Sequence, residues 1–388
     1  MMARLLRMEK DRPVGKFILR CSKSGFKKTR SAAVKSGHDY PFNALSMHCN
    51  RYKNDLIRAS ADTPIQLARK PRMRMGVACA SGIATVASVL LVLATTAAGA
   101  TEAALQVGEI APGVFVYVGA HAAATPDNHG AIANVGFIVG TRCVAVIDSG
   151  GSFGEGVALR RAIAARTPLP VCYVINTHVH PDHVYGNAAF VADKPHFVGH
   201  RNLAASMGAR RAYYEAFLER SLGAAQAAQS VLVPPDMAVV ATQTLDLGGR
   251  ELKLQAWPTS HTDNDITVLD TKTGTLWLGD LLFRERIPVI DGKLAGWLAT
   301  MDSLAGMAAT RVVPGHGAPS TDWPGALAPQ RRYLIAVRDG VRQALKARQT
   351  ISQATATVAA SERDKWLLFN DFHAHNVTAA FTELEWED

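Results

Sequence analysis

Cysteine is scarce in this chain and unevenly placed. Of five cysteines in 388 residues, three precede residue 100, and only Cys143 and Cys172 follow it. No pair has the spacing of a zinc finger, so that class of protein is excluded. Cys143 and Cys172 each stand near the start of an apolar run. Two interpretations stay open for them: small buried hydrophobic side chains, or a disulfide formed in an oxidising compartment.

Other common signals are absent as well. No internal repeat or low-complexity block follows residue 100. The 288 residues from Thr101 to Asp388 are enough for one sizeable core. They suit a single α/β domain with a tail.

The net positive charge is confined to the first quarter of the chain. Residues 1–100 contain 18 of the 42 Lys and Arg but only 5 of the 33 Asp and Glu, a net charge of +13. The remaining 24 basic and 28 acidic residues give residues 101–388 a net charge of −4. The alkaline composition therefore belongs to the leader, and nucleic acid is not an expected partner.

The leader has the order of a secretory signal. Two arginines precede an uncharged apolar stretch at 76–94, and small residues follow at 98–100. We predict a signal peptide over residues 73–100, cleavage after Ala100, and a periplasmic protein with no stable membrane insertion. The alternative is an uncleaved anchor, although its Ser and Thr residues make the stretch a poor span. Residues 1–72 are interpreted as a start codon placed too early, or else as a disordered basic arm.

The most informative segment follows a short apolar, β-branched run at 171–176 that predicts a buried strand. Four metal-ligand side chains fall within six residues there: His178, His180, Asp182 and His183. Imidazole nitrogen and carboxylate oxygen are ligands that zinc accepts. They stand on the loop after a strand, where sites form in α/β sheets. The first two histidines point the same way, and the pair after Pro181 can point elsewhere, so one loop can serve two metals.

Further donors stand at other predicted strand ends. His261 lies in a polar loop between strand-like segments at 251–256 and 266–269. Asp280 ends the apolar run 276–280, and glycines flank His316, which lets the backbone approach closely. Each residue alone is a weak signal. A binuclear site needs more than four protein ligands, and these residues would supply the rest. The specific signal is the order in which all the motifs follow one another along the chain.

This order of motifs resembles the metallo-β-lactamase superfamily over about residues 105–320. The resemblance implies an α/β fold, a four-layer αββα sandwich over residues 101–322, with a helical C-terminal extension over 323–388. It implies two zinc ions per chain, one held by His178, His180 and His261, the other by Asp182, His183 and His316, with Asp280 bridging both. Asp148, after the strand-like run 144–147, resembles the carboxylate that orients ligand imidazoles in this family.

The choice within the superfamily can be narrowed. The bridging residue is Asp280 rather than cysteine or serine, which resembles the glyoxalase II and lactonase type more than true β-lactamases. His180 stands where flavodiiron proteins usually carry glutamate, which argues against a redox site with two iron ions. Segments at 134–140, 261–268, 276–283 and 380–386 are similar to the quinoprotein relay system zinc metallohydrolases (SoxH-like proteins). That similarity implies a periplasmic quinoprotein dehydrogenase system as partner.

The expected activity is hydrolysis of a small thioester, lactone or ester. Two zinc ions that share a water would lower its pKa from about 16 to near 7 and supply a hydroxide. Asp182 is the expected catalytic residue, orienting the nucleophile or accepting its proton. His129, just before the strand entry at 130–137, is predicted to line the substrate pocket. The alternatives are a mononuclear iron oxygenase of the persulfide dioxygenase type and a non-catalytic partner of a dehydrogenase.

The remaining patterns predict secondary structure more coarsely. A helix at 202–224 carries an aromatic stripe that suits a core or a pocket wall. A polar, aromatic tail is expected after residue 361. The other expected elements are strands near 114–118, 134–140 and 143–147, a helix at 154–166, a hairpin at 245–252, and helices at 325–348 and 351–361.

Overall fold

The structure is a computed structural model that describes residues 103–387. The expected signal peptide over 73–100, its cleavage after Ala100 and both interpretations of residues 1–72 lie outside this range. Within it, no helix combines the length and the hydropathy that crossing a membrane requires.

The first sheet has seven strands that lie side by side in chain order: β1 (Gly108–Ala111), β2 (Val114–Tyr117), β3 (Val135–Val139), β4 (Val144–Ile147), β5 (Val171–Ile175), β6 (His196–His200) and β7 (Met237–Val239). The strands from β1 to β4 pair antiparallel, and those from β4 to β7 pair parallel. Because β4 and β5 are parallel, their carboxyl ends meet at one edge of the sheet. Asp148 follows the end of β4, and the histidine-rich loop (Thr177–His183) follows the end of β5.

The second sheet has five strands in the order β12 (Arg311–His316), β11 (Thr275–Phe283), β10 (Ile266–Asp270), β9 (Glu251–Ala256) and β8 (Thr242–Asp246). The predicted hairpin is confirmed as β8 and β9. Ile138 and Ile147 of the first sheet share one buried cluster with Leu254, Val268 and Trp277 of the second. The two sheets therefore pack face to face. Burial of each such side chain contributes about 1.5–3 kcal/mol.

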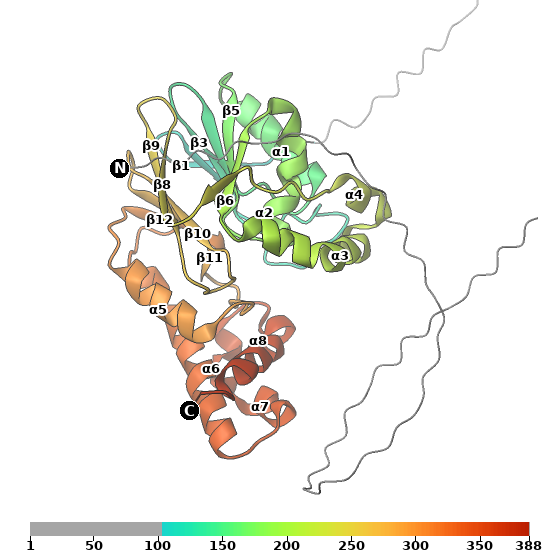
Figure 1. Ribbon diagram of the computed structural model, residues 1–388, viewed down its shortest axis with the longest axis vertical. Coiled ribbons are helices and arrows are strands. Elements are labelled where there is room, and N and C mark those ends of the chain that lie inside the picture. Colours follow the sequence, from blue (N-terminus) through green and yellow to red (C-terminus); the bar gives the residue numbers. More distant parts are fainter. Residues whose placement is uncertain (1–102, 388) are drawn as a thin grey trace, which may run out of the picture. The chain divides into compact units, whose positions relative to one another are not determined.

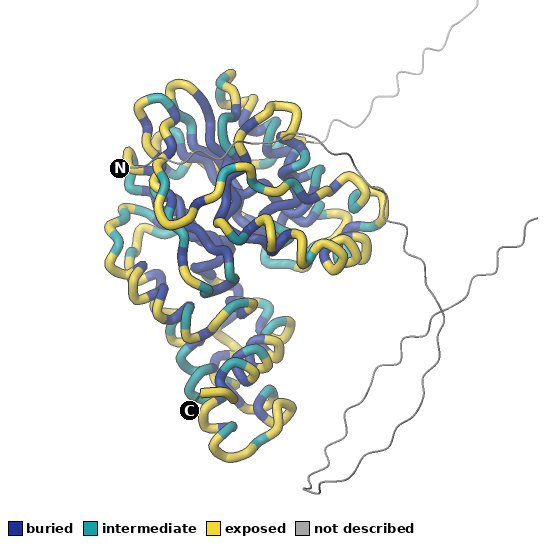
Figure 2. The backbone as a smooth tube through the Cα atoms, in the orientation of Figure 1, coloured by how far each residue is buried: buried dark blue, intermediate teal, exposed yellow. Residues whose placement is uncertain are grey.

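Helices cover the outer face of each sheet (Figure 1). On the first sheet, Leu159 of α1 (Phe153–Ala164) and Phe190 of η1 (Tyr185–Asp193) pack on Val146. On the second, α5 (Leu294–Ala305), α6 (Ala328–Lys346) and α8 (Phe369–Leu384) share one core with Leu282. The chain thus has the predicted helix–sheet–sheet–helix layers. Figure 2 shows the buried strands at the centre of these layers and exposed residues along the outer helix faces.

The remaining helices lie around the two sheets. α3 (Leu203–Leu222) confirms the helix predicted at 202–224, and its stripe of aromatic and apolar side chains divides: Tyr214 and Leu218 are buried, whereas Tyr213 is exposed. The helix predicted at 325–348 begins as a 3-10 turn and continues as α6. The other bounds are α2 (Pro181–Val184), α4 (Ala224–Gln229), η2 (Gly325–Leu327), α7 (Ile351–Thr357) and η3 (Ala360–Lys365).

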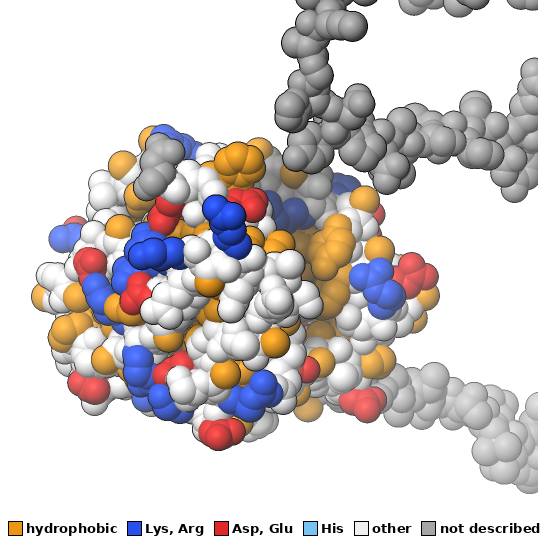
Figure 3. All heavy atoms as spheres, turned by 90° about the horizontal axis from the view of Figure 1, so that it is seen from below, with side chains coloured by type: hydrophobic (Ala, Val, Ile, Leu, Met, Phe, Trp, Pro, Cys, Tyr) orange, Lys and Arg blue, Asp and Glu red, His pale blue; other side chains and the backbone are white. Residues whose placement is uncertain are grey.

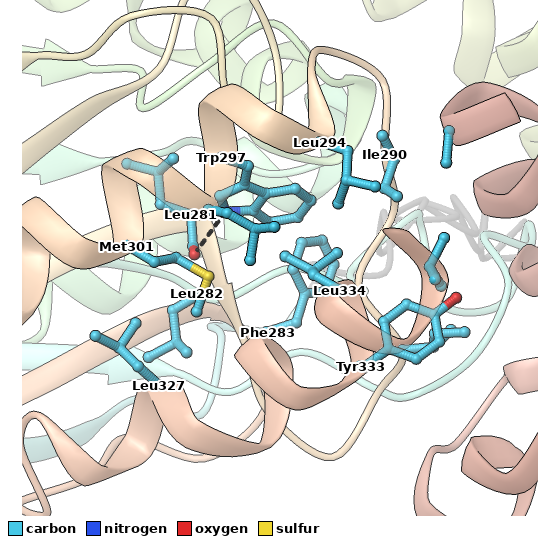
Figure 4. Packing of buried hydrophobic residues seen from close by; sticks show 14 of the residues in the cluster. Leu281, Leu282, Phe283, Ile290, Leu294, Trp297, Met301, Leu327, Tyr333 and Leu334 are labelled. Carbon is cyan, nitrogen blue, oxygen red and sulfur yellow. Dashed lines mark hydrogen bonds between the residues drawn. The ribbon is translucent and has the colours of Figure 1, made fainter. Parts of the chain in front are cut away.

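The helical C-terminal extension implied over 323–388 is confirmed, and the segment after residue 361, expected as a polar, aromatic tail, contains α8. Phe369, Val377, Phe381 and Leu384 recur at helical spacing and are buried. Polar residues separate these apolar positions, so the segment has no continuous apolar run. Figure 4 shows the core that the extension shares with β11, where the Trp297 indole N–H donates to the Leu281 carbonyl (3.1 Å).

Pattern alone did not indicate β6, β7 or α5. It also left the state of Cys143 and Cys172 open. The structure joins them in a disulfide, with Cα atoms 5.8 Å apart. The parallel pairing of β4 with β5 places the two cysteines beside each other. On the face shown in Figure 3, basic and acidic side chains are interspersed, in keeping with the small net charge expected of residues 101–388.

Candidate metal centre

The histidine-rich loop begins where β5 ends and continues into α2. Pro181 occupies the first turn of α2, where its missing N–H leaves no helical bond unmade. The Thr177 amide donates to Asp148 Oδ1 (2.7 Å), and the Asn176 side-chain amide donates to the His183 carbonyl (3.2 Å). These bonds tie the loop to the end of β4 and hold its side chains in place.

The first group of donor side chains combines this loop with the loop before β10 and with β11. Its members are His178, His180, His261 and Asp280, and their donor atoms lie within 4.8 Å of one another. His261 Nε2 is 2.9 Å from His180 Nδ1 and 3.4 Å from Asp280 Oδ2. Four zinc ligands at bond lengths of about 2.1 Å stand roughly 3.4 Å apart on a tetrahedron. These separations therefore fit a single bound cation.

The second group consists of Asp182, His183 and His316, again within 4.8 Å of one another. Asp182 Oδ2 lies 3.3 Å from His316 Nε2. Asp280 faces this group too, because its Oδ1 is 3.2 Å from His183 Nε2 and its Oδ2 is 3.5 Å from His316 Nε2. The structure thus brings all seven predicted donors together and places Asp280 between the two groups.

Two of the imidazoles are oriented through Asp148. The Thr177 hydroxyl donates its hydrogen to Asp148 Oδ2 (2.8 Å). Thr177 Oγ1 can therefore accept from His178 Nδ1 (3.0 Å). Asp148 Oδ2 also accepts from His183 Nδ1 (2.8 Å). Asp148 has a φ of 53°, which non-glycine residues rarely adopt. The structure places this carboxylate in contact with the cluster, at the position where sequence reasoning expected an orienting residue.

The other three imidazoles are anchored by oxygens that can only accept a hydrogen bond. The pairs are His261 Nδ1 with the Val289 carbonyl (2.7 Å), His316 Nδ1 with the Ile132 carbonyl (2.8 Å) and His180 Nε2 with Asp291 Oδ2 (3.1 Å). Each outer nitrogen must therefore carry the hydrogen. A neutral imidazole then presents a lone pair at its other nitrogen. In all five histidines of the cluster that second nitrogen points inward.

Burial and mutual charge decide the protonation of these groups. Burial lowers the pKa of His178 well below its ordinary value, and that of His261 to about 3. Burial alone would raise the pKa of Asp280, but the charges of the surrounding histidines hold it well below its ordinary value. Burial would lower the pKa of His183, yet the carboxylates around it, Asp280 first, raise it well above. In the chain by itself, this imidazole holds the proton that a metal cation would replace.

Several inward atoms are left without a partner. In the part of the chain that the structure describes, His178 Nε2, His183 Nε2 and Asp280 Oδ1 are buried and make no hydrogen bond. Buried polar atoms normally find a partner, because an unpaired one costs free energy. A cation that accepts their lone pairs would satisfy them. The donor set, imidazoles with carboxylates, fits divalent metals such as zinc.

Asp280 differs from expectation in its place on the strand. It was expected to end a strand, but β11 continues to Phe283. Gly279 has a φ of 49°, and the pairing of β11 with β12 shifts register on both sides of it. Such an irregularity re-aims the neighbouring side chain. A Cβ atom on Gly279 would lie 2.5 Å from Thr177 Oγ1, so only glycine lets β11 approach the histidine-rich loop this closely.

A cavity of about 360 Å³ opens beside the cluster. Its wall contains four of the predicted donors together with apolar side chains from α3 and the C-terminal extension: His180, Asp182, Asp280, His316, Phe217, Leu218, Leu368 and Phe372. His129 was predicted to line the substrate pocket, but it is not among the residues of this cavity wall. Its neighbour Gly130 belongs to the wall, whereas the His129 ring lies 3.2 Å from Gln226 Oε1.

Sequence reasoning did not identify two polar residues beside the cluster. Asp291 accepts from His180 and also from Arg210 (3.3 Å), and Arg286 lies in the cavity wall with Nη1 3.1 Å from His316 Nδ1. Both follow β11: Arg286 stands directly after Arg284 and Glu285, and Asp291 follows the apolar run 287–290. Spacing does not show that this segment folds back over the histidines.

The comparisons with known proteins agree with this geometry. A sequence model described as the metallo-beta-lactamase superfamily matches residues 130–316, the span that holds all seven donors. The match covers a little less than half of the chain, and over that span the chain is similar to the metallo-beta-lactamase superfamily. No curated protein matches the chain.

Two solved structures share the fold. A metallo-beta-lactamase family protein from Thermus thermophilus superposes with a TM-score of 0.54 at 19% identity, covering 72% of this chain and 95% of that one. A stereoselective inverting sec-alkylsulfatase from a Pseudomonas species superposes with a TM-score of 0.53 at 17% identity, covering 73% of this chain. This chain spans 50% of the alkylsulfatase. At these identities the likeness establishes the fold alone.

Proposed function

We propose that the chain is a hydrolase dependent on two zinc ions that cleaves a small thioester, lactone or ester. His178, His180 and His261 would hold one ion, Asp182, His183 and His316 the other, and Asp280 both. One observation carries the proposal: every imidazole of the cluster has its outer nitrogen bonded to an oxygen and its inner nitrogen aimed at the other donors. The inner nitrogens and the carboxylates thus converge on positions that cations would fill.

The reaction requires a nucleophile and a place for the substrate. Bound zinc supplies a nucleophile at neutral pH by lowering the pKa of a coordinated water, and it polarises a carbonyl oxygen. Asp182 lies in the cavity wall with its carboxylate partly exposed, so it can orient the nucleophile and take its proton. The apolar wall from α3 and the C-terminal extension would hold the substrate and keep water away.

The proposed location is the periplasm, where a quinoprotein dehydrogenase system would be the partner. The signal-like order of residues 73–100 and the disulfide between Cys143 and Cys172 support export, since disulfides are typical of oxidising compartments. Sequencing the N-terminus of the protein from the periplasmic fraction tests this. The expected first residue is Thr101, and a mature chain that begins before residue 73 would contradict export by this signal.

Metal analysis of the purified protein, combined with a substrate panel, tests the activity. We expect two zinc ions per chain and turnover of a thioester, lactone or ester, and loss of that turnover after treatment with a chelator. A β-lactam and a secondary alkyl sulfate belong in the panel, the latter because an alkylsulfatase shares the fold. One iron per chain would support the mononuclear oxygenase instead. Two zinc ions without any turnover would support the non-catalytic partner.

A further inference from the structure

Arg286 stands out among the residues of the cavity wall. It follows β11, lies in the wall beside the metal-ligand cluster, and is only 5% exposed. A buried guanidinium is costly unless oxygen acceptors surround it, because it cannot lose its charge. Arg286 therefore needs oxygen acceptors close to its guanidinium group.

The protein does not provide these acceptors. Arg286 Nε is buried and makes no hydrogen bond in the described chain. Nη1 lies 3.1 Å from His316 Nδ1, but that nitrogen carries the hydrogen it donates to the Ile132 carbonyl, so it has no lone pair for Arg286. Among the described residues, no carboxylate comes within the 4.0 Å of an ion pair with Arg286. Asp371 lines the same cavity but is exposed and forms no such pair.

The position of Arg286 is held firmly by the extension. On either side of it, the Ile287 amide donates to the Leu367 carbonyl (3.0 Å), and the Leu367 amide donates to the Glu285 carbonyl (2.9 Å). The guanidinium lies over the Phe372 ring, 5.0 Å from its centroid. A ligand anion would therefore meet a guanidinium that is already oriented, which reduces the entropy lost on binding.

We propose that Arg286 binds a carboxylate of the substrate, so that the preferred substrates are esters, thioesters or lactones with an apolar body and one negative charge. This rests on the hydrolase function proposed above. The carboxylate would lie on the His316 side of the cavity, where a guanidinium can bind both of its oxygens. The apolar body would lie against Phe217, Leu218 and Leu368. A volume of about 360 Å³ suits a small molecule of this kind.

Two esters that differ only in charge test the proposal. The mono-p-nitrophenyl ester of adipic acid ends in a carboxylate, and p-nitrophenyl hexanoate has the same chain length and ends in a methyl group. We expect the zinc-loaded full chain to prefer the adipate ester by about tenfold or more in kcat/KM, the scale of one charge-assisted interaction. Arg286→Met should abolish this preference, mainly by raising KM for the adipate ester. Arg286→Lys should retain part of it, because it retains the charge.

The matched control is Arg331→Met, which removes an exposed arginine of α6 paired with Asp302 (2.7 Å). It should keep the wild-type preference. A wild-type chain with no preference, or an Arg286→Met chain that loses both activities equally, would overturn the proposal. Zinc content should match wild type in Arg286→Met. Loss of one zinc ion would show instead that Arg286 only positions His316.

A direct binding measurement separates this inference from the hydrolase function. If neither ester is cleaved, the proposed activity fails, but the carboxylate site can still be tested by calorimetric titration with hexanoate. Binding about tenfold weaker in Arg286→Met than in wild type and in Arg331→Met would support the site. Equal affinity in all three proteins would refute it.

Discussion

At the residue scale, Asp280 occupies a unique place among the donors, because it faces both groups at 3.2 to 3.7 Å. Two cations a few ångströms apart repel strongly, and a shared carboxylate offsets that repulsion. Asp280→Ala should therefore lower zinc content from two toward one per chain and remove most of the hydrolysis, as metal analysis and initial rates would show. Asp302→Ala, on the exposed surface of α5, is the control. Two tightly held ions and full activity in the Asp280 variant would rule out a bridged site.

Glu155 is a second residue whose environment predicts a measurable property. It is buried in the first turn of α1, where its Oε2 accepts from the Gly151 amide (2.7 Å) and its Oε1 has no partner among the described residues. Burial raises its pKa from 4.5 to about 8. The folded chain therefore binds this proton more tightly than the unfolded chain, and the stability it contributes is lost as the pH rises from about 4.5 through about 8.

Glu155→Gln keeps an oxygen for the Gly151 amide and removes the titration. The melting temperature of wild type should fall more between pH 5 and pH 8 than that of the variant. Thermal unfolding across this range is the measurement. Glu219→Gln, exposed on α3, should follow wild type. Parallel curves for wild type and Glu155→Gln would show that Glu155 does not titrate in this range.

At the scale of single elements, the irregular course of β11 is what delivers Asp280 to the histidines. Gly279→Ala would place a side chain in a left-handed conformation, at a cost of about 1–2 kcal/mol. It would also drive a methyl group into Thr177. We expect a lower free energy of unfolding and a lower zinc content, because Thr177 orients His178. Chemical denaturation and metal analysis measure both.

A second glycine provides the control for this prediction. Gly208 lies within α3, and a Cβ atom there would meet nothing within 4 Å. Gly208→Ala should raise the free energy of unfolding by about 0.5–1 kcal/mol, because alanine favours helix over glycine. If both substitutions had the same effect, the irregularity at Gly279 would have no part in building the centre.

At the scale of the whole described domain, the C-terminal extension completes the site. Asn376 of α8 is fully buried, accepts from the Ile290 amide (2.9 Å) and donates to the Pro288 carbonyl (2.7 Å). Between these residues lies Val289, whose carbonyl anchors His261, and Asp291, which anchors His180, follows. The extension therefore holds the segment that orients two of the predicted ligands.

Asn376→Ala should destabilise the chain by about 1–3 kcal/mol, because it leaves buried backbone groups without partners. It should also raise KM severalfold, since the loosened segment forms part of the cavity wall. Urea unfolding and steady-state kinetics measure the two effects. Thr378→Ala, exposed on the same helix, should change neither. Loss of stability with unaltered kinetics would separate the extension from the site.

The sequence by itself determined the donors and the fold class. Short, continuous apolar runs predicted β2, β3, β4 and β5, and the segment at 245–252 predicted the β8–β9 hairpin, because the residues of each segment carry the pattern themselves. The His178–His183 segment and Asp148 follow adjacent parallel strands, so their meeting at one edge was predictable from chain order. Motif order then pointed to one superfamily, and all seven expected donors do converge.

Only the tertiary structure decided what surrounds these donors. Whether the Gly279 irregularity turns Asp280 inward depends on the approach of Thr177 from the loop after β5. Whether Gly130 or His129 faces the cavity depends on how far a loop rotates, which spacing does not encode. Arg286 and Asp291 reach the histidines because α8, about 80 to 100 residues further along the chain, holds their segment in place. Contacts between residues so distant in sequence leave no local pattern, since the partners come together only when the chain folds.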